Sequence, residues 1–230
     1  MNLKITRPKD LVASGNGTIV IIDAIRATST ADVIFSASSL DMIWAVPTPD
    51  AVKSVENQDN VLVFSELSKE TSEFNRVDNS PTVALNTDYK DVTPVLVTTN
   101  GTRAMHAALA LSNHVVLASI RNAEAICRYL KAEKSTSIDI VPSGDFKSNT
   151  SHIEDDVCAQ FIRSKLKNAD FDLENQLQSI WDDDRIKRRL NKEPSLHRDI
   201  ELCLQPDVSE VCIKVEETSN PLVLKLMRIP

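Results

Sequence analysis

The amino-acid sequence predicts an α/β fold, in which helices cover a layered sheet that is mixed or largely parallel. Three observations support this prediction: short β-branched apolar runs alternate with helix-like runs, the connections between them are short, and two strand-to-helix junctions carry the same polar pattern. With 230 residues, of which 42% are hydrophobic and 26% charged, the chain can bury a full core. We therefore expect a single domain over residues 1–230, with two similar α/β halves as the alternative.

In the first half of the chain, each predicted strand is a short apolar run that ends at polar turn residues. Strands are expected at residues 18–23, 42–46 and 61–64, one helix through the apolar run that ends at Phe35, and a capped helix from Thr48 to Val55. Residues 65–91 lack periodicity and are rich in Ser, Thr, Asn and Asp, which predicts a long functional loop with one short strand near Val83.

The second half continues the alternation of strands and helices. Strands are expected at residues 94–97, 115–118 and 137–141, helices from Arg103, over 122–130 and over 153–166, and helical pieces within 174–204. The alternating runs at 211–215 and 222–226 are suited to a hairpin.

Composition narrows the range of functions. A formal net charge of -7 disfavours nucleic-acid binding, and the basic run from Arg185 to Lys192 is interpreted as the end of a helix whose dipole it complements. No apolar run is long enough for a membrane span, and the N-terminus has no apolar signal core, so we expect a cytoplasmic protein. The four cysteines are interpreted as buried free thiols, and the four histidines lack the spacing of a zinc site.

The most informative segment runs from Thr98 to Ala104, where polar residues, Gly101 and Arg103 lie between a strand-like and a helix-like run. The first free N–H groups of a helix favour a phosphate, sulfate or carboxylate, and an arginine can add a two-pronged contact. Glycine would let the backbone approach the ligand closely. This segment therefore predicts an anion site at the tip of a strand.

An earlier segment repeats this layout. Residues 18–23 are strand-like, with Asp23 at the end of the run, and Arg26-Ala27 stands where Arg103-Ala104 stands in the later segment. The two arginines would converge if their strands were neighbours in one sheet, and the site would lie at the carboxyl ends of the strands.

These two segments and three further motifs resemble those of the ComB-like 2-phosphosulfolactate phosphatases, and the resemblance extends over nearly the whole chain. The motifs that carry the resemblance are Asp23-Ala24-Ile25-Arg26-Ala27-Thr28-Ser29-Thr30, Asn79-Ser80-Pro81, Thr98-Thr99-Asn100-Gly101-Thr102-Arg103-Ala104, Ser119 with Asn122-Ala123, and Glu154-Asp155 followed by Cys158-Ala159. The resemblance implies a magnesium-dependent phosphoric monoester hydrolase that converts 2-phosphosulfolactate to sulfolactate and phosphate in coenzyme M biosynthesis. It also implies a homodimer, although no patch in the sequence indicates one.

Under this interpretation, Asp23, Arg26 and Arg103 are catalytic. The carboxylates proposed to provide a Mg²⁺ site, not all in direct contact with the ion, are those of Asp23, Glu66, Glu154 and Asp155. The residues expected to bind the small acidic phosphorylated substrate are Thr28, Ser29, Thr30, Asn79, Ser80, Thr98, Thr99, Asn100, Gly101, Thr102, Ser119 and Asn122.

Three alternatives stay open at this point. Asp23 either attacks phosphorus directly or orients a metal-bound water, and the sequence does not decide between them. Where the family has Gly-Glu-Arg, this chain has Ser65-Glu66-Leu67, which fits a diverged, non-catalytic module that binds a small phosphorylated or sulfonated ligand. A third interpretation keeps the phosphatase chemistry with another small acidic phosphoester as substrate.

Overall fold

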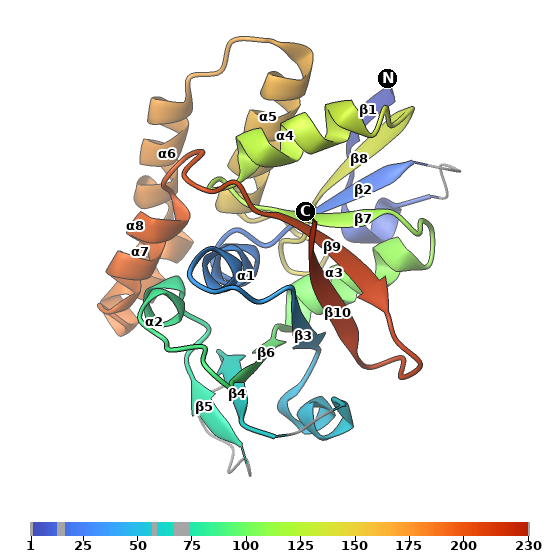
Figure 1. Ribbon diagram of the computed structural model, residues 1–230. Helices are drawn as coiled ribbons and strands as arrows, with labels where there is room; N and C mark the ends of the chain where they lie inside the picture. Colours follow the sequence, from blue (N-terminus) through green and yellow to red (C-terminus); the bar gives the residue numbers. More distant parts are fainter. Residues whose placement is uncertain (1, 13–16, 57–58, 67–73, 230) are drawn as a thin grey trace.

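The computed structural model describes residues 2–12, 17–56, 59–66 and 74–229, which form a ten-stranded sheet with helices on both faces (Figure 1). The strands are β1 (Asn2–Ile5), β2 (Thr18–Ile22), β3 (Met42–Val46), β4 (Val61–Ser65), β5 (Asn75–Val77), β6 (Thr93–Val97), β7 (Val115–Ala118), β8 (Ser137–Pro142), β9 (Cys212–Glu217) and β10 (Leu224–Ile229). The helices are α1 (Ala27–Ser36), α2 (Pro81–Leu85), α3 (Thr99–Leu109), α4 (Ala123–Ala132), α5 (Ile153–Lys167), α6 (Leu173–Asp182), α7 (Asp184–Lys192) and α8 (Leu196–Cys203), with 3₁₀ turns at Pro8–Asp10 and Pro49–Ser54. The α/β prediction is confirmed.

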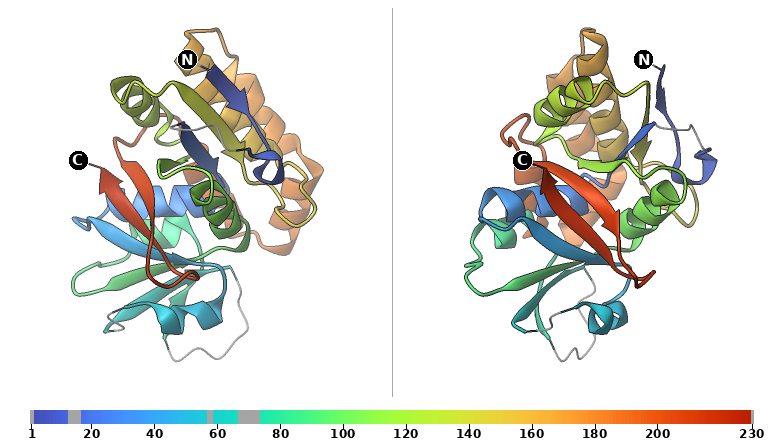
Figure 2. Two further views of the ribbon diagram at one scale, coloured as in Figure 1. Left: turned by 90° about the vertical axis from the view of Figure 1, so that its right-hand side faces the viewer. Right: turned by 45° about the vertical axis from the view of Figure 1, so that its right-hand side comes forward.

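The strand order is symmetric about a central hairpin. The order is β1-β8-β2-β7-β9-β10-β3-β6-β4-β5, and all pairs are parallel except the three that involve the hairpin β9–β10. Four parallel strands therefore lie on each side of the hairpin (Figure 2). Strands β2 and β6, which precede the two polar turns, are each the second strand outward from it.

The two turns meet although β2 and β6 are not neighbours. Three antiparallel pairs lie between these strands, so in a flat sheet their carboxyl ends would lie at opposite edges. Nevertheless, the Thr98 hydroxyl after β6 donates to the carboxylate of Asp23 after β2 at 3.1 Å. The right-handed twist that accumulates over successive strands explains how the sheet brings both ends together.

Strand β2 is buried on both faces, and its side chains alternate between two cores. Val20 and Ile22 pack into a core shared with α4 and α5, whereas Ile19 and Ile21 pack into a core shared with α1 and α3. This continuous apolar character is typical of a parallel strand covered by helices on both sides.

Three local expectations were wrong. The segment after Thr48 is a 3₁₀ helix, Pro49–Ser54, which the Thr48 side chain does not cap. Val83 lies in α2 rather than in a strand, because Ser80 caps the helix with its side chain and Pro81 occupies the first helical turn; the extra strand of this region is β5. Helix α3 begins at Thr99 rather than at Arg103, so the predicted turn is its first helical turn. Leu67 of the Ser65-Glu66-Leu67 segment lies outside the described residues. Among the residues that the structure describes, no helix combines the length and apolar character needed to cross a bilayer.

Candidate active site

Asp23 follows β2 directly and faces the first turn of α3. Its Oδ2 accepts the hydroxyl of Thr98, which precedes the helix, and the backbone N–H of Gly101 also bonds to the carboxylate. A Cβ atom at Gly101 would lie 2.8 Å from this Oδ2 atom. Glycine is therefore needed here because it lets the start of α3 approach the carboxylate.

The electrostatic environment makes Asp23 a weak acid. Burial, followed by the nearby charge of Glu66 and that of Glu154, raises the pKa of Asp23 to about 7, whereas the bonds from Thr98 and Gly101 lower it. A carboxyl group with this pKa exchanges its proton near neutral pH, which suits acid–base chemistry or the binding of a cation.

Arg26, at the start of α1, is buried and bound by two carboxylates. Its Nη1 donates to Asp78 at 2.5 Å and to Asp199 at 2.6 Å, and its Nη2 donates to Asp78 at 3.0 Å. Burial lowers the pKa of Arg26, but the bonds and charge of Asp78 outweigh it, so the net shift is upward. The guanidinium is therefore fully charged, and two of its nitrogens are already engaged with acids.

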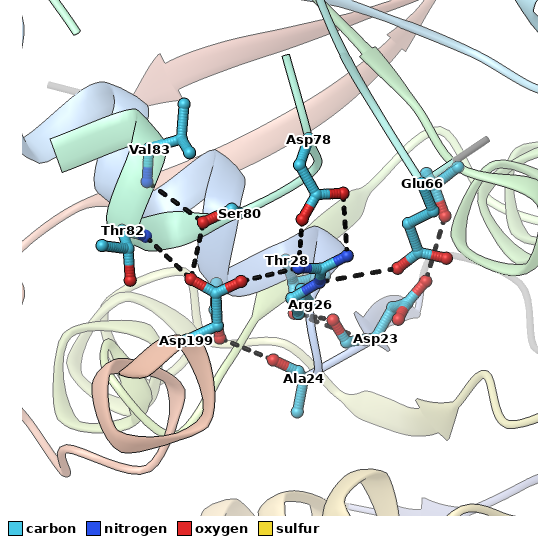
Figure 3. A network of polar contacts seen from close by, with 12 residues as sticks. Asp23, Ala24, Arg26, Thr28, Glu66, Asp78, Ser80, Thr82, Val83 and Asp199 are labelled. Atoms are coloured by element: carbon cyan, nitrogen blue, oxygen red, sulfur yellow. Dashed lines mark hydrogen bonds and ion pairs between the residues drawn. The ribbon is translucent and has the colours of Figure 1, made fainter. Parts of the chain in front are cut away.

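Glu66 connects Arg26 with Asp23. One oxygen of its carboxylate lies 3.9 Å from Nε of Arg26, and Figure 3 shows the Glu66 side chain reaching between the guanidinium and Asp23. Glu66 is half exposed, with 48% of its side chain accessible, in contrast to Arg26 beneath it. Glu66 and Asp78, of whose side chain 38% is accessible, are therefore the accessible acids of this cluster.

Asp199 on α8 is a buried acid that links three segments (Figure 3). Besides Arg26, it accepts the Ser80 hydroxyl at 2.6 Å and the backbone N–H of Thr82 at 3.2 Å. Sequence reasoning missed both Asp199 and Asp78. A signal for Asp199 was present: it lies among Leu196, Ile200 and Cys203 at helical spacing, so an acid occupies the apolar face of a helix.

Two further predicted acids lie at the start of α5. Asp155 accepts the backbone N–H groups of Ala24 at 2.7 Å and Gly144 at 2.9 Å, and burial, together with Glu154 and Asp23, raises its pKa. Glu154 is buried and forms an ion pair with Arg185 of α7. Both acids thus hold neighbouring segments beside Asp23.

Only two of the four carboxylates expected to provide a Mg²⁺ site remain candidates for binding the ion. Within the described ranges, no group of three or more His, Cys, Asp or Glu residues is arranged to hold a metal ion. Asp155 and Glu154 are engaged by backbone amides and by Arg185, which leaves Asp23 and the accessible Glu66. A pair of carboxylates fits Mg²⁺, because this ion keeps several waters and usually takes one or two protein carboxylates together with substrate phosphate.

Several predicted substrate-binding hydroxyls are bonded to the backbone instead. Thr28 donates to the carbonyl of Asp23 at 3.0 Å, Ser29 to that of Ala24 at 2.7 Å, and Thr102 to that of Val46 at 3.2 Å. These bonds shape the two turns around Asp23.

Other predicted residues lie in different surroundings. The Oδ1 of Asn122 accepts the backbone N–H of Ser119 at 2.8 Å, and its amide donates to the carbonyl of Val211 at 3.0 Å, which ties α4 to the hairpin. Asn100 accepts the backbone N–H of Phe146 at 3.2 Å. Asn79 is fully buried, and neither polar atom of its amide has a hydrogen-bond partner within the described part of the chain.

Arg103 differs from Arg26 in almost every respect. It lies exposed on the first turns of α3, and we find no ion pair for it among the described residues. Thr99 at the beginning of the same helix is exposed as well. These are the groups of the second turn that a ligand can reach without displacing an internal partner.

A cavity of about 930 Å³ opens beside Arg26 and Glu66. Its size is in the range of small-molecule sites. The lining residues are Arg26, Ser65, Glu66, Arg76, Val77, Asp78, Ser80, Thr82, Val83, Arg189, Lys192, Glu193, Ser195 and Asp199.

Comparison with known proteins places this geometry in a family. The model of the family described as 2-phosphosulpholactate phosphatase matches residues 5–218. The chain belongs to the 2-phosphosulpholactate phosphatase family. The resemblance inferred from the turns at Asp23 and Gly101 is thereby confirmed.

Three relatives, each named probable 2-phosphosulfolactate phosphatase, illustrate the extent of the similarity. A protein of Thermus thermophilus is 32% identical over 55% of this chain and 52% of its own length, and one of Clostridium novyi is 32% identical over 69% and 66%. One of Caldanaerobacter subterraneus is 27% identical over 86% of this chain and 87% of its own length. The match thus spans about half to two thirds of the first two relatives and most of the third.

Proposed function

We propose that this protein is a phosphatase that hydrolyses a small acidic phosphomonoester, most directly 2-phosphosulfolactate to sulfolactate and phosphate, with Mg²⁺ as cofactor. The observation that carries the proposal is the position of Asp23, whose weakly acidic carboxyl lies against the first turn of α3 and beside Glu66. Membership of the family and the names of the relatives support the same activity.

The residues of the chain divide the work as follows. The free N–H groups of the first turn of α3 and the exposed Arg103 bind the phosphoryl oxygens. Asp23 lies beside this position, and its Oδ2 is held by Thr98. It either orients a water that attacks phosphorus as the ester P–O bond breaks and the alcohol leaves, or attacks phosphorus itself with the same leaving group, after which water hydrolyses the aspartyl phosphate. Asp23 and Glu66 would hold Mg²⁺, which when bound neutralises charge on the phosphoryl group.

Arg26 has a supporting role in this scheme. Because Asp78 and Asp199 neutralise it internally, it positions α1 and α8 around Asp23 rather than binding the phosphoryl group as a free cation. Asp155, through the amides of Ala24 and Gly144, fixes the backbone on either side of Asp23.

One observation favours a second candidate, a ligand-binding module without turnover. Arg26 is occupied by acids, and the described residues contain no preassembled cluster of three metal ligands. Such a module would bind a phosphorylated or sulfonated ligand in the same place and release no phosphate.

The two candidates are separated by measuring release of inorganic phosphate from 2-phosphosulfolactate and a panel of small phosphomonoesters, first with Mg²⁺ and then with EDTA. The phosphatase proposal expects release that EDTA abolishes and that Asp23→Asn lowers by at least about 100-fold. Absence of release from every compound, with ligands still raising the thermal unfolding midpoint, would establish the binding module instead.

A further inference from the structure

Three basic residues of α7 share one face of the helix. Arg185, Arg189 and Lys192 are separated by four and three positions, which places them in one stripe. Arg185, the first residue of the stripe, forms an ion pair with the buried Glu154 at the start of α5, and this contact fixes the orientation of the stripe. Lys187, two positions after Arg185, lies on the opposite face and pairs with Asp182 in solvent at 3.2 Å.

The outer two members of the stripe line the cavity beside Arg26. Arg189 and Lys192 are both among its lining residues, and Arg76 of β5 contributes a third basic group. Arg76 is held in place by a bond from its Nη2 to the Ser65 hydroxyl at 2.9 Å. Segments that are far apart in the sequence thus bring positive charge to one cavity.

Four acidic residues also line the cavity: Glu66, Asp78, Glu193 and Asp199. Asp78 and Asp199 are both bound to Arg26, whose single positive charge offsets one of their two negative charges. Glu66 lies at the Asp23 end, and Glu193 is exposed beside Lys192. On the α7 side of the cavity, the two positive charges of Arg189 and Lys192 therefore face the single negative charge of Glu193.

The helix dipole accounts for only part of this arrangement. Basic residues in the last turn of a helix complement its dipole at any position around the axis. Dipole complementarity therefore explains why the end of α7 is basic, but not why Arg189 and Lys192 both lie on the face that lines the cavity. Among the described residues, we find no ion pair for either side chain.

We propose that Arg189 and Lys192, together with Arg76, form a subsite for the second acidic group of the substrate, a sulfonate or carboxylate remote from the phosphoryl group. The inference rests on the proposed function for the position of the phosphoryl group beside Asp23. Glu66 and Arg26 lie near Asp23 and line the same cavity as Arg189 and Lys192, so a short substrate bound across them would present its acidic end to α7. Guanidinium groups suit this task because they bind two oxygens of an acidic group at once.

The test compares two substrates with matched variants in the presence of Mg²⁺. The substrates are 2-phosphosulfolactate and methyl phosphate, which lacks a second acidic group. The double variant Arg189→Gln/Lys192→Gln is expected to raise the KM for 2-phosphosulfolactate by at least about tenfold, with kcat little changed and methyl phosphate turnover unaffected. The control Lys187→Gln removes a charge from the opposite face of α7 and is expected to change neither substrate.

Charge-preserving replacement separates recognition from folding. Arg189→Lys/Lys192→Arg is expected to recover most of the lost affinity, and thermal unfolding of all variants shows whether α7 remains folded. An unchanged KM for 2-phosphosulfolactate in the double glutamine variant would overturn the subsite, and so would an equal loss for both substrates.

Calorimetric binding of 2-phosphosulfolactate distinguishes failure of the subsite from failure of the phosphatase proposal. If the unmodified protein binds this compound without releasing phosphate, and only the double glutamine variant loses binding by about tenfold or more, the subsite stands and the phosphatase proposal fails. If the unmodified protein neither hydrolyses nor binds the compound, or binds it as tightly as the double variant does, the subsite is overturned.

Discussion

The two strand-to-helix turns have similar sequences and different surroundings. In the first turn, Arg26 is buried and bound by Asp78 and Asp199, whereas Arg103 in the second turn is exposed on α3. The first turn also supplies the acid of the site, Asp23, and the second supplies the hydroxyl and N–H groups that hold it. A shared pattern of residues therefore produces complementary halves of one site rather than two equivalent anion sites.

The largest difference between the two turns should appear in the free energy of unfolding, when Arg26 and Arg103 are each replaced by methionine. Arg26→Met leaves Asp78 and Asp199 beside each other without their cation, so we expect it to lower the free energy of unfolding by about 3–5 kcal/mol. Arg103→Met, at an exposed position, should change it by less than about 0.5 kcal/mol. Urea unfolding of both variants measures this difference, and equal losses would mean that the two arginines have equivalent surroundings.

The pH dependence of stability should report the proton of Asp23. Because its pKa is about 7 in the folded protein and 3.8 is the ordinary value, the folded state keeps a proton that the unfolded state releases. Its contribution to stability is therefore complete below about pH 4 and is lost as pH rises towards and through 7, by about 2–4 kcal/mol. In metal-free buffer, Asp23→Asn should remove this fall, so that the variant is more stable than the parent at pH 8.

Unfolding profiles between pH 4 and pH 8 provide the comparison. The buried Asp155 also has a raised pKa and contributes a fall of the same sign in both proteins, so the informative quantity is the difference between the two profiles. Parallel profiles would show that Asp23 has an ordinary pKa.

Activity should reveal the role of the exposed arginine. If Arg103 binds the phosphoryl group, Arg103→Gln loses a charge-assisted contact, and kcat/KM should fall by roughly 10- to 100-fold with the unfolding midpoint unchanged. Arg198→Gln, at another exposed arginine on α8, serves as the matched control for the loss of one positive charge. Equal kinetics of the two variants would remove Arg103 from the site.

The smallest effect concerns the contact that joins the two turns. Thr98→Val removes the hydroxyl that bonds to Asp23, which should cost about 1 kcal/mol of stability and raise the pKa of Asp23 further. Thr99→Val makes the same change at the neighbouring exposed position and should leave both quantities unaltered. The upper end of the pH-dependent fall in stability should therefore move to higher pH in the Thr98 variant alone.

The sequence was sufficient for the fold class and for most strands because their signals are local. Val20 and its neighbours form an uninterrupted apolar run, and the alternation at 211–215 predicted the hairpin. It also identified Asp23 and Gly101, which meet in the structure. The route by which they meet was not predictable, since it depends on the accumulated twist of a ten-stranded sheet whose two halves run in opposite directions.

The missed residues share a physical cause. Asp78 and Asp199 both bind Arg26, which is distant from them in sequence, so no local sequence pattern predicts the pairing. The basic end of α7 shows the same limit: its composition agrees with the helix dipole, and only the packing of α7 shows which residues line the cavity.

The central hairpin also determines when the site can form during synthesis. Val215 of β9 pairs with Val115 of β7, and Leu224 of β10 pairs with Ala45 of β3, so residues 212–229 join the two parallel halves of the sheet. These residues are translated after both halves. The emerging chain therefore exposes two unpaired strand edges, at β7 and β3, until the hairpin is inserted between them. The closing step brings segments of high sequence separation together, which makes slow folding and dependence on chaperones an expected property of this sheet.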